Sequence, residues 1–171
     1  EYAWRKRDVD MAILLEKAIK NLEEKTKNFF PSDPNLNDFG GGRQHHLRDF
    51  AHHPTELTTT LNAAMNMGFR KVWAVFQPFT FSRTKLHLDA FAKALSIADN
   101  VVLTEIMGSR EINTYGITTQ DLADEIPGSV WFDTFPKVAD YLKENITEGD
   151  LVLTLGCGDV YKIAKLILGK E

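Results

Sequence analysis

Two adjacent histidines stand in the stretch of the sequence that is richest in reactive side chains. His52 and His53 are followed by Pro54, which the first turn of a helix tolerates, while Asp49 and Glu56 place a carboxylate on either side. An imidazole can hold charge near neutral pH, and the free N–H groups of a helix N-terminus favour anions. The pattern predicts either a contact to a phosphate or carboxylate, or a polar helix start in which Glu56 complements the dipole. The residues alone favour neither alternative.

A second candidate is Arg83, which follows an apolar run and begins a helical pattern. The planar guanidinium binds a carboxylate or a phosphate through two parallel hydrogen bonds, so an arginine at this position is typical of an anion site. Taken by itself, the residue fits a surface arginine better. Its assignment therefore depends on what the fold places beside it.

Other patterns with known chemistry are incomplete. The chain has five histidines, but adjacent rings do not easily turn toward one ion, and no ligand spacing typical of zinc is present. We therefore predict no metal site, and a histidine-based metal regulator is kept as an alternative. Cys157 is the single cysteine, which excludes a disulfide framework within the chain. The turn Gly156-Cys157-Gly158-Asp159 lacks the third glycine of a dinucleotide loop, and no G-x-x-x-x-G-K-[ST] phosphate loop occurs.

The elements that must position these side chains follow a regular pattern from residue 49 onward. Apolar runs typical of strands buried on both faces lie at 72–76, 101–104, 129–132 and 151–155. Helices are predicted from Pro54 to Gly68, from a Ser82 cap through Leu95 with Leu86 on the buried face, from a Thr118 or Thr119 cap through Ile126, around 138–142, and after Asp159. The alternation predicts an α/β fold, a Rossmann-like parallel sheet with helices on both faces. Ligands bind beyond the carboxyl ends of such strands, so one edge should be lined by segments 77–84, 105–118, 133–134 and 156–159.

The first 48 residues differ from the rest in composition. An amphipathic helix is predicted from Val9 to about Lys27, and a loop rich in Pro, Asn, Gly and His from Phe30 to Arg48. We therefore divide the chain into an N-terminal helix and linker, 1–48, and a Rossmann-like domain, 49–171.

Charge and composition narrow the class of protein. The formal net charge is -4, so no general attraction to nucleic acid or to an anionic membrane is expected. No apolar run approaches the roughly 20 residues that span a bilayer, and a lone cysteine fits a reducing compartment. We expect a cytoplasmic protein whose ligands are small molecules rather than nucleic acid or membrane.

Four blocks, taken together and in order, resemble the C-terminal domain of the Mur ligases. They are residues 49–56, 75–78 with 81–84, 103–106 with 109–111, and 149–156 with 158–159. The resemblance covers roughly residues 49–169, and three of the blocks fall at the strand ends or helix starts selected above. Within that family the chain is most similar to the member that joins L-alanine to UDP-N-acetylmuramate.

The resemblance implies an ATP-dependent ligase of peptidoglycan precursor synthesis. In that reaction ATP phosphorylates the carboxylate of UDP-N-acetylmuramate, the amino group of L-alanine attacks the acyl phosphate, and phosphate leaves. The family places Mg²⁺ and the ATP phosphates on a central domain with a phosphate loop, and the nucleotide-sugar mainly on an N-terminal domain. This sequence shows neither domain, so we expect it to be inactive alone and to hold no ATP or Mg²⁺ tightly.

The resemblance also assigns roles to single residues. It implies two catalytic candidates: His52, which faces the transferred phosphate and the reacting carboxylate, and Arg83, which holds the carboxylate of the amino acid. It implies nucleotide contacts for Asp49 and for His53 beside it. Arg43 would stand for an arginine that reaches the phosphates.

Departures from the family's pattern leave other interpretations open. Phe79 stands where the family usually has a histidine, and Thr80 where another arginine often stands. Only five residues separate Arg43 from Asp49, where the family places a whole strand, so the stretch 40–48 looks truncated. The alternatives are a stand-alone module that binds a nucleotide or another anion, and the ligase that returns a murein tripeptide to the same sugar acid.

Overall fold

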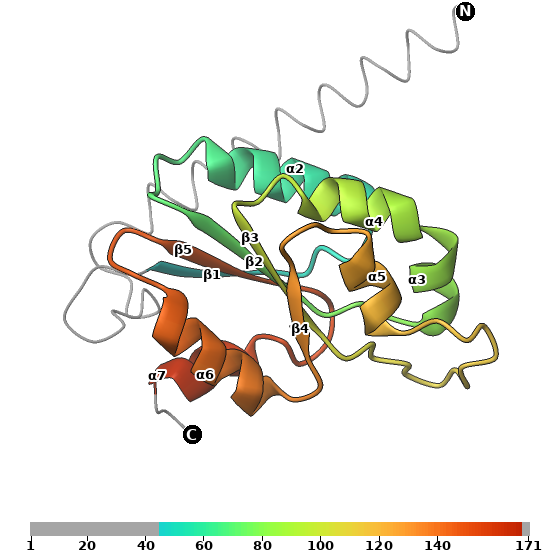
Figure 1. Ribbon diagram of the computed structural model, residues 1–171. Coiled ribbons are helices and arrows are strands. Elements are labelled where there is room, and N and C mark those ends of the chain that lie inside the picture. Colours follow the sequence, from blue (N-terminus) through green and yellow to red (C-terminus); the bar gives the residue numbers. More distant parts are fainter. Residues whose placement is uncertain (1–44, 169–171) are drawn as a thin grey trace, which may run out of the picture. The chain divides into compact units, whose positions relative to one another are not determined.

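The computed structural model describes residues 45–168 of the chain (Figure 1). The strands are β1 (His45–Asp49), β2 (Val72–Phe76), β3 (Asn100–Thr104), β4 (Val130–Phe132) and β5 (Leu151–Leu155). Over these residues they form one five-stranded sheet in the order β1-β5-β2-β3-β4, and every neighbouring pair is parallel. The α/β fold with a Rossmann-like parallel sheet is therefore confirmed.

The two central strands show why the apolar runs predict strands so well. Every residue of β2 and β5 is buried, because each of these strands has a neighbour on both sides and helices over both faces. Only Thr154 interrupts their apolar residues. Its hydroxyl meets an imidazole nitrogen of buried His46 at 3.0 Å. A buried polar group that is paired in this way avoids the cost of desolvation.

Strand β1 corrects the prediction of a loop up to Arg48. Residues 45–48 belong to this strand, and the predicted boundary between residues 48 and 49 falls inside it. The sequence conceals the strand because it lies at the edge of the sheet, with His46 rather than an aliphatic residue facing Thr154. The predicted helix at 9–27 and the candidate Arg43 lie outside the described residues. The division of the chain at residue 48 stays a prediction.

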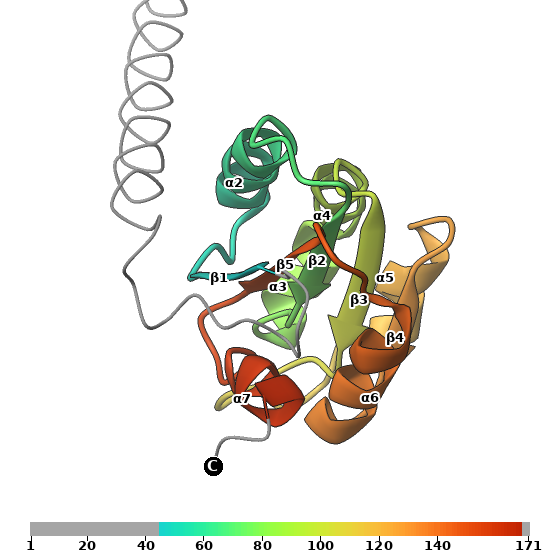
Figure 2. The same cartoon turned by 90° about the vertical axis from the view of Figure 1, so that its left-hand side faces the viewer.

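Helices cover both faces of the sheet (Figures 1 and 2). Their bounds are α2 (Pro54–Met65), α3 (Phe81–Leu86), α4 (Leu88–Leu95), α5 (Thr119–Asp124), α6 (Phe135–Asn145) and α7 (Lys162–Leu168). Helices α2, α4 and α5 contribute to one buried cluster, and α6 and α7 to the other. None of the helices in residues 45–168 combines the length and the apolar character that crossing a membrane requires.

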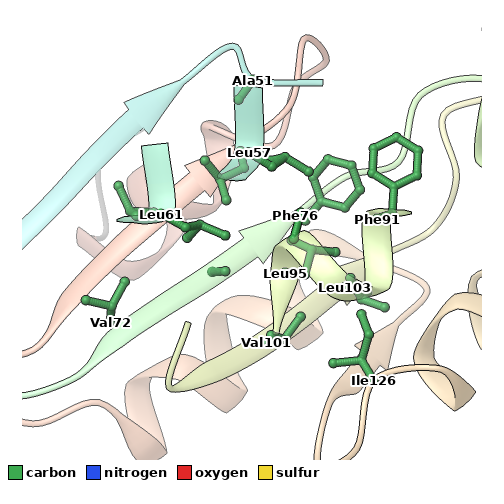
Figure 3. Close-up of a cluster of buried hydrophobic side chains, with 14 of the residues drawn as sticks. Ala51, Leu57, Leu61, Val72, Phe76, Phe91, Leu95, Val101, Leu103 and Ile126 are labelled. Atoms are coloured by element: carbon green, nitrogen blue, oxygen red, sulfur yellow. The ribbon is translucent and has the colours of Figure 1, made fainter. Parts of the chain in front are cut away.

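The core follows the two-residue alternation of the strands. Phe76 and Leu103 face α2 and α4, where Leu57, Phe91 and Leu95 pack against them (Figure 3). Val75, one residue away on β2, faces the opposite cluster, which includes Val138, Leu142 and Ile163. Burying a side chain of this size contributes about 1.5–3 kcal/mol. The apolar pattern of the strands thus accounts for both layers of helices.

The helix predicted from Ser82 through Leu95 is two helices. The chain breaks at His87, and Leu86, predicted to be buried, is 77% exposed. Thr80, not Ser82, occupies the cap position of α3, and its side chain makes no capping hydrogen bond. The break turns Leu86 away from the apolar stripe that α4 continues. The predicted Thr118 cap of α5 is confirmed, since its hydroxyl accepts from the Asp121 N–H and Asp121 accepts in return.

An ion pair between a buried carboxylate and a half-exposed arginine lies at the amino end of the sheet. Asp150, fully buried before β5, accepts hydrogen bonds from the indole N–H of Trp73 at 3.0 Å and from the backbone N–H of Thr147 at 3.1 Å. Arg70 pairs with the same carboxylate at 2.9 Å and also donates to the Thr147 hydroxyl. Three donors therefore compensate one buried charge.

The connections define where a ligand fits. The chain leaves β2 toward α3 and α4 on one face, and it leaves the neighbouring β5 toward α7 on the other face. In parallel sheets, ligands bind at the carboxyl ends of two adjacent strands whose outgoing connections part in this way. The segments after β2 and β5 lie at this end of the sheet.

Candidate functional site

Asp49 ends β1 and fixes the start of the turn that leads into α2. One carboxylate oxygen accepts from the backbone N–H of Ala51 at 3.1 Å, and the other accepts from the Thr60 hydroxyl at 2.6 Å. The Asp49 carbonyl accepts from the N–H of Gly156 at 3.1 Å, which ties the turn to the end of β5. The structure thus places Asp49 at the carboxyl edge of the sheet and uses both of its oxygens within the chain.

His53 is the N-cap of α2. Its Nδ1 accepts from the Thr55 N–H at 3.3 Å, and the Glu56 carboxylate accepts from the backbone N–H groups of His52 and His53 at 2.9 and 3.1 Å. Although burial raises the pKa of Glu56, these two backbone hydrogen bonds bring it below its ordinary value. The polar helix start predicted as the second alternative therefore describes His53 and Glu56.

His52 is oriented differently from its neighbour. Its Nδ1 lies 2.9 Å from the carbonyl oxygen of Phe50, and because a carbonyl only accepts, Nδ1 donates this hydrogen bond. Within residues 45–168 no hydrogen bond reaches Nε2, so this nitrogen is left for a ligand. The ring is 35% exposed, and its Nδ1 also lies 3.5 Å from Glu56. Nδ1 thus plays opposite roles in the two adjacent histidines, donating to a carbonyl in His52 and accepting from the helix N–H in His53.

His87 lies beside His53, although the sequence predicts His87 to be inside a continuous helix. Its ring meets the ring of His53 edge-on, with 5.2 Å between centroids, and packs against Phe91 at 6.2 Å. The contact links the start of α2 to the break between α3 and α4. Within residues 45–168, no three His, Cys, Asp or Glu side chains gather as metal ligands.

Arg83 lies in the first turn of α3, where the sequence predicts it. It is half-buried, and its guanidinium carbon lies 6.0 Å from the ring centre of Phe79. Thr80, just before the helix, has a φ of 64°, which a β-branched side chain rarely adopts. The Thr80 N–H donates to the Met107 carbonyl at 2.9 Å. The turn that carries Arg83 is thus held by the segment after β3.

Glu111 contacts the residue directly before Arg83 and is not among the predicted site residues. Its carboxylate accepts from the hydroxyl of Ser82 and, at 2.9 Å, from the backbone N–H of Ser82. The Ser82 hydroxyl, then the Ser82 N–H, hold the pKa of Glu111 below its usual value, and the charge of Arg83 lowers it further. The only signal in the sequence is its place in a family block, because the partners are separated by 29 residues.

A buried polar group without a partner lies at the carboxyl ends of β2 and β5. Gln77 is only 8% exposed, and its Oε1 is buried with no hydrogen bond. A side chain on Gly158 would overlap Gln77 Oε1 and lie 2.6 Å from Met107 Sδ, and Gly156 has a φ of 135°. The glycines of the turn after β5 therefore permit close approach, and the group they approach is Gln77.

The parallel sheet brings the predicted residues to one edge. Asp49 ends β1, and Gln77 and Gly156 directly follow β2 and β5; the three strands lie side by side in register. His52 and His53 continue from β1, and Arg83 continues from β2. Among the predicted residues, only Arg43 lies outside the described part of the chain. The roles assigned to these side chains stay predictions.

Known proteins with similar sequences are amino-acid ligases. The chain is 45% identical over 126 residues to the UDP-N-acetylmuramate–L-alanine ligase of Lachnospira eligens. The match covers 71% of this chain and 28% of that relative, so the chain spans about a quarter to a third of the relative's length.

Solved structures share the fold at lower identity. The UDP-N-acetylmuramate–alanine ligase of Thermotoga maritima matches with a TM-score of 0.58 and 22% identity, over 82% of this chain and 28% of that chain. A bifunctional folylpolyglutamate synthase/dihydrofolate synthase from Yersinia pestis, complexed with AMPPNP and a Mn ion, has a TM-score of 0.53 and 18% identity, over 81% of this chain and 31% of that one.

A family match covers most of the described fold. The family described as "Mur ligase, glutamate ligase domain" matches residues 41–158, which is more than half of the chain and reaches from just before β1 to the turn after β5. All five strands and every residue of the ordered blocks except Asp159 lie within this match. The chain therefore belongs to the Mur ligase family.

Proposed function

We propose that this chain is the part of a UDP-N-acetylmuramate–L-alanine ligase that binds the incoming amino acid and completes the nucleotide site. The observation that carries the proposal is the placement of His52 and Arg83 at one sheet edge, in a chain 45% identical to a ligase of that name. The reaction would take place in the cytoplasm, as the sequence predicts.

The proposed reaction has two steps. A carboxylate oxygen of UDP-N-acetylmuramate attacks the γ-phosphorus of ATP, and ADP leaves. The amine nitrogen of L-alanine then attacks the carbonyl carbon of the acyl phosphate and sheds a proton. As the C–N bond forms, the C–O bond to phosphate breaks, and phosphate leaves with the bonding electrons.

The side chains of the edge suit this chemistry. When the ring of His52 is doubly protonated, its Nε2–H donates a hydrogen bond to the transferred phosphate or the reacting carboxylate, and such bonds stabilise charge that develops in the transition state. Arg83 binds the carboxylate of L-alanine, which orients the amine. Asp49 and His53 border the nucleotide, and Arg43 reaches its phosphates.

Magnesium accompanies ATP in the proposed enzyme and neutralises phosphate charge when bound. The described residues offer no cluster of three carboxylate or imidazole ligands, and the sequence has no phosphate loop. We therefore place the metal and the phosphate cradle in the part of the relatives that this chain does not span. What residues 45–168 supply is orientation and hydrogen bonding.

The test uses the complete polypeptide that carries this sequence. We expect phosphate release to require ATP, UDP-N-acetylmuramate and L-alanine together, measured by a coupled phosphate assay. Release that requires a murein tripeptide instead of L-alanine would assign the chain to the recycling ligase. Calorimetry on residues 1–171 with an ATP analogue should show weak or no binding, whereas tight one-to-one binding would favour a stand-alone nucleotide module.

A further inference from the structure

The pairing of β2 and β3 continues beyond the ends of these strands. The Met107 N–H donates to the Pro78 carbonyl at 2.8 Å, and the Thr80 N–H donates to the Met107 carbonyl at 2.9 Å. Phe79 and Met107 form a parallel bridge. The backbone before Arg83 is thus attached to the segment Met107–Glu111, which we call the clamp segment.

The turn before Arg83 needs this attachment. A non-glycine residue with the φ of Thr80 costs about 1–3 kcal/mol and persists only where its surroundings fix it. Helix α3 has six residues, too few to be stable by itself. The hydroxyl and the N–H of Thr84 donate to the Thr80 carbonyl at 2.7 and 3.2 Å, which secures the turn from the helix side.

Glu111 secures the turn from the other side. Thr80 provides no side-chain cap, and the carboxylate of Glu111 instead takes the backbone N–H and the hydroxyl of Ser82. It performs from a distant loop what an N-cap residue performs locally, because the first N–H groups of a helix have no partner within the helix. Ser82 is the residue directly before Arg83.

Gly108 brings the two segments into contact. A side chain at this position would overlap the ring of Phe81, and its carbon atom would lie 3.4 Å from the Glu111 carbonyl. The φ of Gly108 is not positive, so a glycine at this position serves close packing rather than an unusual backbone conformation. The ring of Phe81 therefore rests on the clamp segment beside the Glu111 contact.

We propose that Glu111 is a positioning residue for Arg83, an inference that rests on the proposed function. By occupying the donors at the start of α3, Glu111 fixes the backbone of Ser82 and leaves the guanidinium of Arg83 as the group that meets the amino acid's carboxylate. The carboxylate of Glu111 does not itself touch the substrate. Its loss should affect the binding of the amino acid and leave nucleotide binding unchanged.

The experiment compares variants of the complete ligase. Glu111→Gln keeps the size of the side chain but places an NH₂ group against a donor of Ser82, so the KM for L-alanine should rise about tenfold, the effect of one charge-assisted hydrogen bond. The kcat and the KM for ATP should stay within about twofold of wild type. Glu125→Gln is the matched control, an exposed carboxylate at the end of α5, away from the carboxyl edge.

Variants of Ser82 test the mechanism. Ser82→Ala should raise the KM for L-alanine, and Ser82→Thr, which keeps the hydroxyl, should have a KM close to that of the wild type. The double variant Ser82→Ala/Glu111→Gln should have a KM for L-alanine no higher than that of Glu111→Gln alone, because both changes remove the same interaction. Gly108→Ala, which displaces Phe81, should produce the same selective change. If Glu111 had only a structural role, these variants would lower the melting temperature without raising the KM for L-alanine at an unchanged kcat.

Two failures are distinguishable. If the wild-type ligase does not use L-alanine, the proposed function fails regardless of Glu111. If the wild type uses L-alanine but Glu111→Gln matches Glu125→Gln, or lowers kcat and leaves the KM for L-alanine unchanged, the positioning role of Glu111 is wrong. If the Glu111→Gln protein does not fold, the KM of Ser82→Ala for L-alanine decides the question instead, because this variant removes only a hydroxyl.

Discussion

At the scale of single residues, His52 and Arg83 are held in different ways. His52 is oriented by one hydrogen bond to the Phe50 carbonyl in its own turn, whereas the backbone of Arg83 depends on partners about 25 residues further along the chain, Met107 and Glu111. A local contact survives most changes elsewhere in the molecule. Substitutions in the segment 107–111 should therefore be able to change the position of Arg83, whereas the orientation of His52 depends on its own turn.

Arg83→Ala should weaken the proposed amino-acid site selectively. Loss of a charge-assisted pair costs about 1.5–3 kcal/mol, so the KM for L-alanine should rise roughly 10- to 100-fold, while binding of the nucleotide-sugar stays nearly intact. Steady-state kinetics of the complete ligase measures both. Lys85→Ala, an exposed cation on the same helix, is the control, and an unchanged alanine response in Arg83→Ala would refute the role.

His46 gives the fold a dependence on pH. Burial, with a smaller effect of the Arg48 charge, lowers the pKa of His46 from 6.5 to about 4. A group whose folded pKa is lower than its unfolded value binds protons more readily when unfolded, so stability is full above pH 6.5 and falls as pH drops toward 4. The loss amounts to roughly 3 kcal/mol.

Urea unfolding between pH 7.5 and 4 measures this loss. His46→Phe removes the titrating group, so its stability should change less over this range, whatever its value at pH 7.5. The Arg48→Ala variant controls for the neighbouring charge. Equal pH dependence in the wild type and His46→Phe would show that His46 does not contribute.

At the scale of elements, the amino end of the sheet depends on Asp150. Asp150→Ala leaves the Trp73 indole N–H and the Thr147 N–H without their acceptor and removes the partner of Arg70. Unpaired buried donors cost about 1–3 kcal/mol each, and Arg70 is half exposed, so we expect a loss of roughly 2–4 kcal/mol. Chemical denaturation should show it, with Asp140→Ala, an exposed residue of α6, as the control. A loss below about 1 kcal/mol would contradict the network.

The elements also show what sequence reasoning reaches. The runs in β2, β3 and β5 predict strands because burial on both faces requires apolar residues throughout. A cap at Thr118 or Thr119 is predicted because threonine there stands directly before a helical pattern, and the structure assigns the cap to Thr118. Strand β1 is missed because its pairing with β5 spans most of the described chain, and polar residues conceal it. The break at His87 is missed because the apolar spacing continues on both sides of it.

At the scale of the whole molecule, the edge that carries the candidate site follows from topology. Parallel strands place every carboxyl end on one side, so the segments after β2, β3, β4 and β5 can be predicted to lie at one edge without knowledge of any contact. The partners within that edge cannot be predicted in this way. Glu111 and His87 enter only because the folded loops bring them to Ser82 and His53.

The position of β5 between β1 and β2 also bears on how the chain folds. Leu151 pairs with both His45 and Val72, so the interior of the sheet contains the strand that comes last in the sequence among the described strands. Parallel pairing between strands that are distant in the sequence forms slowly, because the entropy cost of closing a long loop comes before any stabilising contact is made. Until β5 inserts, β1 has no neighbour in the sheet, and the turns that bear His52 and Gln77 lack the strand that joins them. The candidate site should therefore appear in the final cooperative step of folding, not grow along with the chain.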